Sequence, residues 1–79
     1  MADVTFEIKN HLLVLSTGIK GWTKEVNVVS WNNRKPKLDI REWDEAHEKM
    51  GKGITLNKEE LLQLKELLNG IDFEQLGLE

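Results

Sequence analysis

Aromatic and basic side chains gather in residues 28–43, which read VVSWNNRKPKLDIREW. The residues concerned are Trp31, Arg34, Lys35, Lys37, Arg41 and Trp43. Indole rings provide flat surfaces on which unpaired bases stack, for roughly 1–3 kcal/mol per base, and basic side chains neutralise the phosphates. A duplex hides its bases, so these residue types indicate binding of a single strand, provided that they share one surface.

Strand alternation predicts which of these side chains share a surface. Residues 37–43 are predicted to form a strand, in which successive side chains point to opposite faces of the sheet. Leu38 and Ile40 then lie on one face, and Lys37, Arg41 and Trp43 lie on the other. If a helix covers the apolar face, the second face stays open.

A preceding strand is expected over about residues 22–31, and its alternation places Asn27 and Trp31 on the matching face. Residues 32–36 fit a hairpin turn, since asparagine tolerates positive φ and proline cannot donate to a strand ladder. The two strands together predict a sheet face on which aromatic rings lie beside cations.

Burial in the core is the alternative interpretation for each tryptophan, because tryptophan is highly buried on average. Trp31 and Trp43 share their face with basic side chains, which favours binding. Trp22 follows a turn and alternates onto the face of Val26, so it is a candidate for either the core or the binding surface.

The net charge of −3 conceals a strong asymmetry along the chain. Residues 20–41 contain six basic and two acidic residues, a net charge of +4, whereas residues 42–79 contain four basic and ten acidic residues, a net charge of −6. Surface fields follow local charge within a Debye length of about 8–10 Å, so a cationic and an anionic face can coexist. The cations expected to neutralise phosphates are Lys20, Lys24, Arg34, Lys35, Lys37, Arg41 and Lys52.

The 79 residues are expected to form one domain, residues 1–79, with an ordered core over about residues 5–71. A chain of this length buries only about 60–65% of its unfolded surface, so oligomerisation is the expected source of further burial. The final residues Leu78 and Glu79 can be read as a remnant of cloning.

The sequence contains no cysteine, which excludes disulfides and thiolate metal sites and favours a reducing cytoplasm. The start, MADVTFEIKN, lacks the basic end and apolar run of a secretion signal, and no run approaches the about 20 apolar residues of a membrane span. We therefore expect a cytoplasmic protein without a membrane partner.

The remaining elements predict an α+β fold of four antiparallel strands followed by one helix, ββββα. The first strand is expected from the alternation at residues 6–9 and the apolar run at residues 12–15. Residues 44–50 are polar and acidic, as in a connection, and residues 51–53 read as a tight turn before a brief fourth strand at residues 54–56.

An amphipathic helix is expected after Asn57, which with Glu60 has the form of a capping box, and Gly70 fits its stop. The apolar stripe is wider than a small sheet needs, so part of it is expected to form a dimer interface. The residues of this interface are Leu61, Leu64, Leu67, Leu68 and Ile71.

Catalytic and metal-binding patterns are weak in this sequence. His11 and His47 are far apart, and neither has a partner at the spacing of metal ligands. Gly51-Lys52-Gly53 lacks the strand, loop and helix of a phosphate-binding loop, although Lys52 can still meet a phosphate. We expect no enzyme, metal, cofactor or small-molecule substrate.

Two segments, LDIREW and MGKGITLNKEELLQLKELL, resemble the signature of the transcriptional positive cofactor four (PC4-like) family. The chain looks most like its short bacterial YdbC-type branch, and the resemblance covers roughly residues 5–70. It implies a homodimer in which each chain contributes a curved four-stranded antiparallel sheet and a C-terminal helix. It also implies binding of single-stranded DNA along the curved sheets, with little sequence preference.

On the residues that match, the resemblance implies that Arg41 is the family's binding arginine and that Trp43 is the aromatic residue after it. The other matching positions are Lys52 before G-I, Trp31 at the end of the second strand, and Lys35 and Lys37 in the basic hairpin. The chain departs from the family at Asp44, where a second aromatic residue is usual, and the hairpin at residues 32–36 is one residue longer.

The function predicted from the sequence is thus sequence-tolerant binding of single-stranded DNA in transcription, replication or repair. One alternative is a protein-interaction module that contacts a transcription or repair partner through its acidic C-terminal half. A second alternative is RNA as the ligand, because no residue pattern here identifies a reader of the 2′-hydroxyl group.

Overall fold

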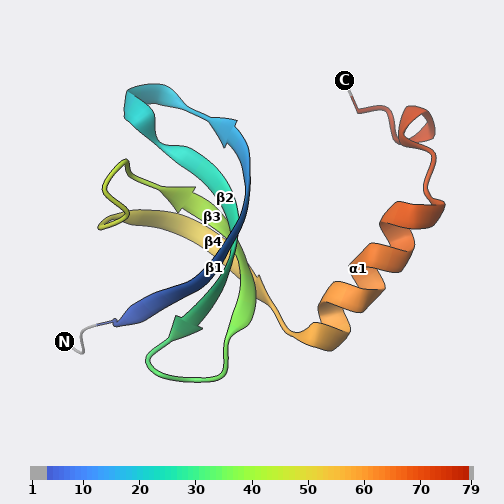
Figure 1. Ribbon diagram of the computed structural model, residues 1–79. Helices are drawn as coiled ribbons and strands as arrows, with labels where there is room; N and C mark the ends of the chain where they lie inside the picture. Colours follow the sequence, from blue (N-terminus) through green and yellow to red (C-terminus); the bar gives the residue numbers. More distant parts are fainter. Residues whose placement is uncertain (1–3, 79) are drawn as a thin grey trace.

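The computed structural model describes residues 4–78, which form a four-stranded antiparallel sheet followed by one helix (Figure 1). The strands follow the order of the sequence across the sheet. They are β1 (Phe6–Thr17), β2 (Thr23–Trp31), β3 (Lys37–Trp43) and β4 (Met50–Leu56), and the helix is α1 (Lys58–Gly70). Short 3-10 turns flank them, η1 (Ile19–Gly21) and η2 (Phe73–Leu76). The predicted ββββα fold is confirmed, and Glu79 lies outside the described residues.

β1 is long, and it bends. It joins the alternating residues 6–9 and the apolar run 12–15 into one strand, and its pairing with β2 shifts register at three places. Bulges of this kind bend a strand and increase its twist. Figure 1 accordingly shows the strands curving around one side of the sheet.

β2 and β3 pair without a register shift, which places the predicted side chains on one face. Asn27 lies opposite Asp39, and Glu25 lies opposite Arg41. The turn between these strands uses Asn32 and Asn33 at φ values of 50° and 62°, a conformation that asparagine tolerates better than most residues.

β4 begins at Met50, four residues before the expected start, so residues 51–53 are part of a strand and not a tight turn. Gly53 allows this strand to approach β3 closely. A Cβ atom at Gly53 would lie 2.3 Å from both the Cβ of Arg41 and the carbonyl oxygen of Ile40. The glycine is therefore required by the neighbouring strand.

α1 begins with the predicted capping box. The backbone N–H of Glu60 donates to Asn57 Oδ1 at 2.8 Å, and the backbone N–H of Asn57 donates to Glu60 Oε1 at 2.9 Å. The helix includes Gly70 and ends before Ile71, one residue later than expected. Within residues 4–78, no helix has the length and apolar character needed to cross a membrane.

The core occupies the inner side of the curved sheet, and α1 does not cover the other side. Trp43 and Val29 are fully buried, together with the polar side chains of Asn27 and Asp39. In Figure 1, α1 stands apart from the sheet, and it contains no buried residue. The expectation that the helix covers the apolar face is therefore wrong for a single chain, and Ile54 on that face is 56% exposed.

Candidate nucleic-acid interface

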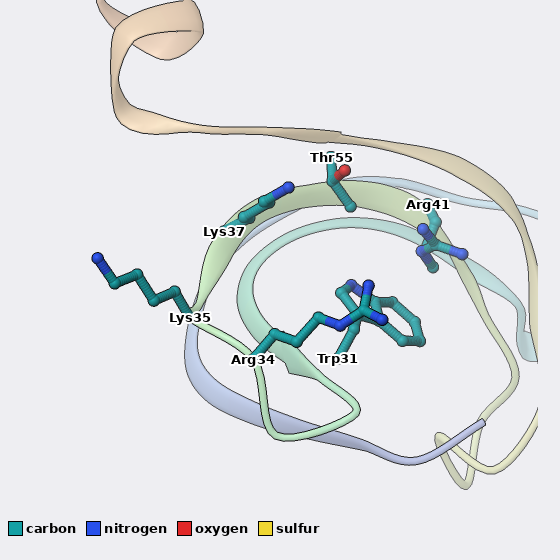
Figure 2. A pocket seen from close by; sticks show the side chains of 6 residues that line it. All are labelled: Trp31, Arg34, Lys35, Lys37, Arg41 and Thr55. Carbon is teal, nitrogen blue, oxygen red and sulfur yellow. The ribbon is translucent and has the colours of Figure 1, made fainter. Parts of the chain in front are cut away.

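A pocket of about 320 Å³ opens beside the β2–β3 hairpin. Its lining residues are Trp31, Arg34, Lys35, Lys37, Arg41 and Thr55. In Figure 2, Trp31 and Arg41 lie within the curve of the strands, whereas Lys35 extends away from the other labelled side chains. The structure thus brings together five residues that were predicted from the sequence to bind nucleic acid, and it adds Thr55, which lies on β4.

The hairpin is held in place by its own hydrogen bonds. The backbone N–H of Arg34 donates to the carbonyl oxygen of Trp31 at 2.9 Å, and Ser30 Oγ donates to the carbonyl oxygen of Arg34 at 2.7 Å. Asn32 Oδ1 accepts from the backbone N–H of Thr5 at 2.9 Å, which ties the start of β1 to the turn. These contacts fix the backbone from which the basic side chains of the pocket extend.

Trp31 is the aromatic wall of the pocket and is partly exposed. Its ring lies nearly parallel to that of Trp43, with an interplanar angle of 11° and 6.5 Å between centroids, and it also contacts Phe6 at 5.7 Å. The guanidinium carbon of Arg41 lies 4.6 Å from the centroid of the Trp31 ring. The indole is therefore supported from within the molecule while part of it reaches the surface.

The basic side chains of the pocket fall into two groups. Arg34, Lys35 and Lys37 are exposed, and none forms an ion pair with a carboxylate of residues 4–78. Arg41 is different, because its side chain is only 14% exposed and its Nε donates to Asp39 Oδ1 at 2.7 Å. The exposed group carries the charge that is available to an anion in solvent.

Trp43 requires a correction, because it is fully buried. Its ring contacts Phe6 at 5.1 Å and His47 at 5.7 Å, in addition to Trp31. Stacking on a base needs an exposed ring face, so the prediction that Trp43 stacks on a base is wrong for this conformation. Asn27 is also fully buried and cannot contact a ligand directly.

Four other nominated residues lie outside the pocket. Lys24 alternates with the buried Glu25 and so points to the opposite face of β2. Lys20 lies in η1 and Trp22 directly after it, at the end of β2 remote from Trp31. Lys52 lies next to the register shift between β3 and β4. The pocket itself therefore contains a smaller set of cations than the sequence suggested.

A buried polar cluster was missed by the sequence interpretation. Glu25 is 2% exposed, and its carboxylate accepts hydrogen bonds from the hydroxyl of Thr23 and, at 3.1 Å, from Asn27 Nδ2. His47 Nε2 lies 2.9 Å from Glu25 Oε2, and His11 Nδ1 lies 2.6 Å from Asn27 Oδ1. The sequence interpretation considered the two histidines only as metal ligands and missed these hydrogen bonds. The alternation of the segment TKEVN was the pattern that indicated a shared polar face.

The cluster holds Glu25 in its charged form. Burial alone raises the pKa of this carboxyl group, but the hydrogen bonds from Thr23, Asn27 and His47, with the charge of His47, outweigh burial and lower the pKa below its ordinary value. Within residues 4–78, no three acidic, histidine or cysteine side chains form a group that could hold a metal ion. The hydrogen bonds of the Glu25 cluster therefore have a structural role, since they join β1, β2 and the segment before β4.

The fold and the pocket together define a small α+β protein with an aromatic and cationic surface on a curved antiparallel sheet. Residues 19–67, more than half of the chain, match the family described as Transcriptional Coactivator p15 (PC4). The chain belongs to this family, and membership associates it with nucleic-acid binding and transcription.

The chain is also similar to an uncharacterized protein of Treponema pallidum (strain Nichols). The two are 40% identical over 72 residues, which cover 91% of this chain and 85% of the relative. This similarity extends beyond the family match toward both ends of the chain. Assignment to a YdbC-type branch stays a prediction.

Proposed function

We propose that this protein binds single-stranded DNA with little sequence preference, without catalysis, and acts as a homodimer in transcription, replication or repair. The observation that carries the proposal is the partly exposed ring of Trp31 in a pocket that the exposed cations Arg34 and Lys37 also line. Family membership independently supports a nucleic-acid ligand.

The chemistry of the pocket suits one unpaired nucleotide at a time. Its volume of about 320 Å³ is at the lower end of the roughly 300–1,000 Å³ of small-molecule sites. Every base has a π-face, so stacking on Trp31 tolerates any base, while the surrounding cations neutralise phosphates irrespective of sequence. These two contacts support affinity without a strong sequence preference.

The exposed area of the single chain supports the dimer. A compact protein of 9.1 kDa has an accessible surface of about 4,900 Å², whereas this chain exposes 6,655 Å². The excess is about 1,800 Å² per chain, or about 3,500 Å² for two chains, which lies within the 2,000–5,000 Å² of obligate homodimer interfaces.

The apolar surface lies where the helix stripe was expected to form the interface. Leu67 is 56% exposed and Leu68 is 46% exposed, although both belong to the apolar stripe of α1. We assign these residues, with the uncovered apolar face of the sheet, to contact with a second copy of the chain. The radius of gyration is 14.4 Å, against about 11.6 Å for a compact chain of this length. This larger value is consistent with a helix α1 that extends from the sheet and packs on a partner.

Replacement of the exposed ring tests the proposed function. Trp31→Ala removes the stacking surface, so the dissociation constant for oligo(dT) should rise about 5- to 150-fold, with an unchanged slope of log K against log salt. The measurement is fluorescence anisotropy with labelled dT oligomers at several salt concentrations. Trp22→Phe is the control and should bind as the wild type does.

Two results would contradict the proposal. An affinity of Trp31→Ala equal to that of the wild type would remove Trp31 from the site, and a failure of the wild type to bind oligo(dT) in low salt would remove the function itself. Tighter binding of rU than of dT oligomers would instead identify RNA as the ligand.

A second candidate function, protein interaction through the acidic C-terminal half, is supported by the segment that follows α1. Phe73 is 55% exposed and Leu76 is 46% exposed, and they lie beside the acidic Asp72 and Glu74. Exposed aromatic and aliphatic side chains among carboxylates suit a basic partner surface. No retention on oligo(dT), with a stable protein partner recovered, would favour this function.

A further inference from the structure

Of the described residues that line the pocket, Thr55 alone has a side chain that can accept a hydrogen bond. The other lining side chains are those of Trp31, Arg34, Lys35, Lys37 and Arg41. Indole, ammonium and guanidinium groups carry N–H donors and no acceptor, whereas a hydroxyl group both donates and accepts. The pocket thus presents many donors to a ligand and a single side-chain acceptor.

The strand pairing places the Thr55 side chain among the cations of the pocket. Thr55 lies across from Asp39, which comes between Lys37 and Arg41 on the same face of β3. In Figure 2, Thr55 accordingly lies between these two basic side chains. A ligand that contacts the cations therefore also meets the hydroxyl group.

The Thr55 hydroxyl is available to a ligand. None of the side-chain hydrogen bonds within residues 4–78 involves it. Its oxygen also reaches the surface, because the buried side-chain atoms of these residues that have no partner belong to Trp31, Asp39 and Trp43.

Other oxygen atoms near the pocket are engaged or enclosed. The carbonyl oxygen of Trp31 accepts from the backbone N–H of Arg34, and the carbonyl oxygen of Arg34 accepts from Ser30 Oγ. The Asp39 carboxylate is fully buried and accepts from Arg41 Nε. A base that enters the pocket therefore meets its accessible side-chain acceptor at Thr55.

We infer that the Thr55 hydroxyl accepts a hydrogen bond from an N–H group of the base that stacks on Trp31, and that the pocket therefore favours thymine. This inference rests on the proposed binding of single-stranded DNA and names the base that the pocket prefers.

The scarcity of acceptors distinguishes the bases. A base N–H that leaves water without finding a new acceptor lowers the affinity. Thymine presents one N–H, at N3, which Thr55 can accept, and its two carbonyl oxygens suit the donors of the pocket. Cytosine and adenine present an amino group with two N–H bonds, and guanine presents three N–H bonds in all. Since Trp31 and Thr55 are partly exposed, water still reaches the base, and the preference is modest.

A comparison of two oligomers tests the contact with Thr55. The wild type should bind oligo(dT) about 2- to 13-fold more tightly than an oligomer of N3-methylthymidine, which lacks the N–H group. Thr55→Val keeps nearly the same side-chain shape without the hydroxyl group, so it should lose this preference. The measurement is fluorescence anisotropy with both labelled oligomers at one salt concentration.

Three further variants complete the comparison. Thr55→Ser retains the hydroxyl group and should keep the preference for oligo(dT). Thr17→Val removes an exposed hydroxyl at the end of β1 remote from the pairing of Phe6 with Trp31, and it should bind as the wild type does. If Thr55→Val does not fold, Thr55→Ala takes its place with the same expected result.

The possible outcomes separate this inference from the proposed function. A contact of Thr55 with a phosphate would make Thr55→Val weaken both oligomers equally, and that result would overturn the inference. Wild-type affinity for oligo(dC) equal to that for oligo(dT) would overturn the preference for thymine. If RNA is the ligand, the same comparison applies to rU and N3-methyluridine oligomers. A wild type that binds none of these oligomers would instead remove the proposed function itself.

Discussion

At the scale of single residues, Trp31 and Trp43 point to the same face of the sheet but have different roles. Strand alternation determines the face of a side chain, whereas its depth depends on the neighbours that other strands supply. Phe6 and His47 pack against Trp43, which is fully buried, while Trp31 lies at the end of β2 and borders the pocket. One tryptophan is therefore core and the other is surface.

Glu25 should make stability depend on pH in a defined direction. Its folded-state pKa is lower than the ordinary value of 4.5, so the carboxylate stabilises the fold fully above that pH, and this contribution is lost as the pH falls through the folded-state pKa. Urea unfolding of the wild type and Glu25→Gln at several pH values should show a stability difference at pH 7 that shrinks in acid.

The exposed Glu7 is the matched control for this prediction, since it is also a strand glutamate but its side chain is 66% exposed. Glu7→Gln should change the free energy of unfolding by less than about 0.5 kcal/mol at any pH. A difference between the wild type and Glu25→Gln that stays constant from neutral to acidic pH would contradict the role assigned to the hydrogen bonds.

At the scale of elements, the sequence predicted the strand bounds and helix cap that depend on residues close in sequence. It missed the features that depend on how closely two strands approach each other. The bounds of β3 and the capping box at Asn57 follow from alternation and from side chains close in sequence. The start of β4 does not follow from local pattern. Glycines at residues 51 and 53 are typical of a turn, and only the pairing of Gly53 with Arg41 on β3 explains a glycine within a strand. The Glu25 cluster was missed for the same reason, since His47 is 22 residues away.

Gly53→Ala should destabilise the protein more than Gly51→Ala. A methyl group at Gly53 would lie 2.3 Å from the backbone oxygen of Ile40, so β4 must move, at a cost of about 1–3 kcal/mol in the free energy of unfolding. At Gly51 the nearest atom would be the Cβ of Glu42 at 3.7 Å, an ordinary contact. Urea unfolding of both variants measures the difference, and equal losses would show that strand approach is not the cause.

At the scale of the whole molecule, the sheet and α1 leave apolar surface that one chain does not cover. The helix stripe was predicted from its spacing, but spacing alone does not distinguish packing on the chain's own sheet from packing on a partner. The position of α1 in Figure 1, away from the sheet, favours the partner. The same chain can then present one pocket per copy, which would let a dimer hold two segments of a strand.

Leu68→Glu should dissociate the proposed dimer. The Leu68 side chain is 46% exposed in the single chain. A glutamate at this position would bury a carboxylate without a partner against the second copy, which is unfavourable. Sedimentation at micromolar concentration should give twice the chain mass of 9.1 kDa for the wild type and a single chain mass for the variant. The wild-type unfolding temperature should also rise with protein concentration, because association stabilises the folded state by mass action.

Gln63→Glu, on the opposite side of α1, adds the same charge and should leave the dimer intact. A wild type that sediments as a monomer, or a dimer that survives Leu68→Glu, would exclude this stripe as the interface.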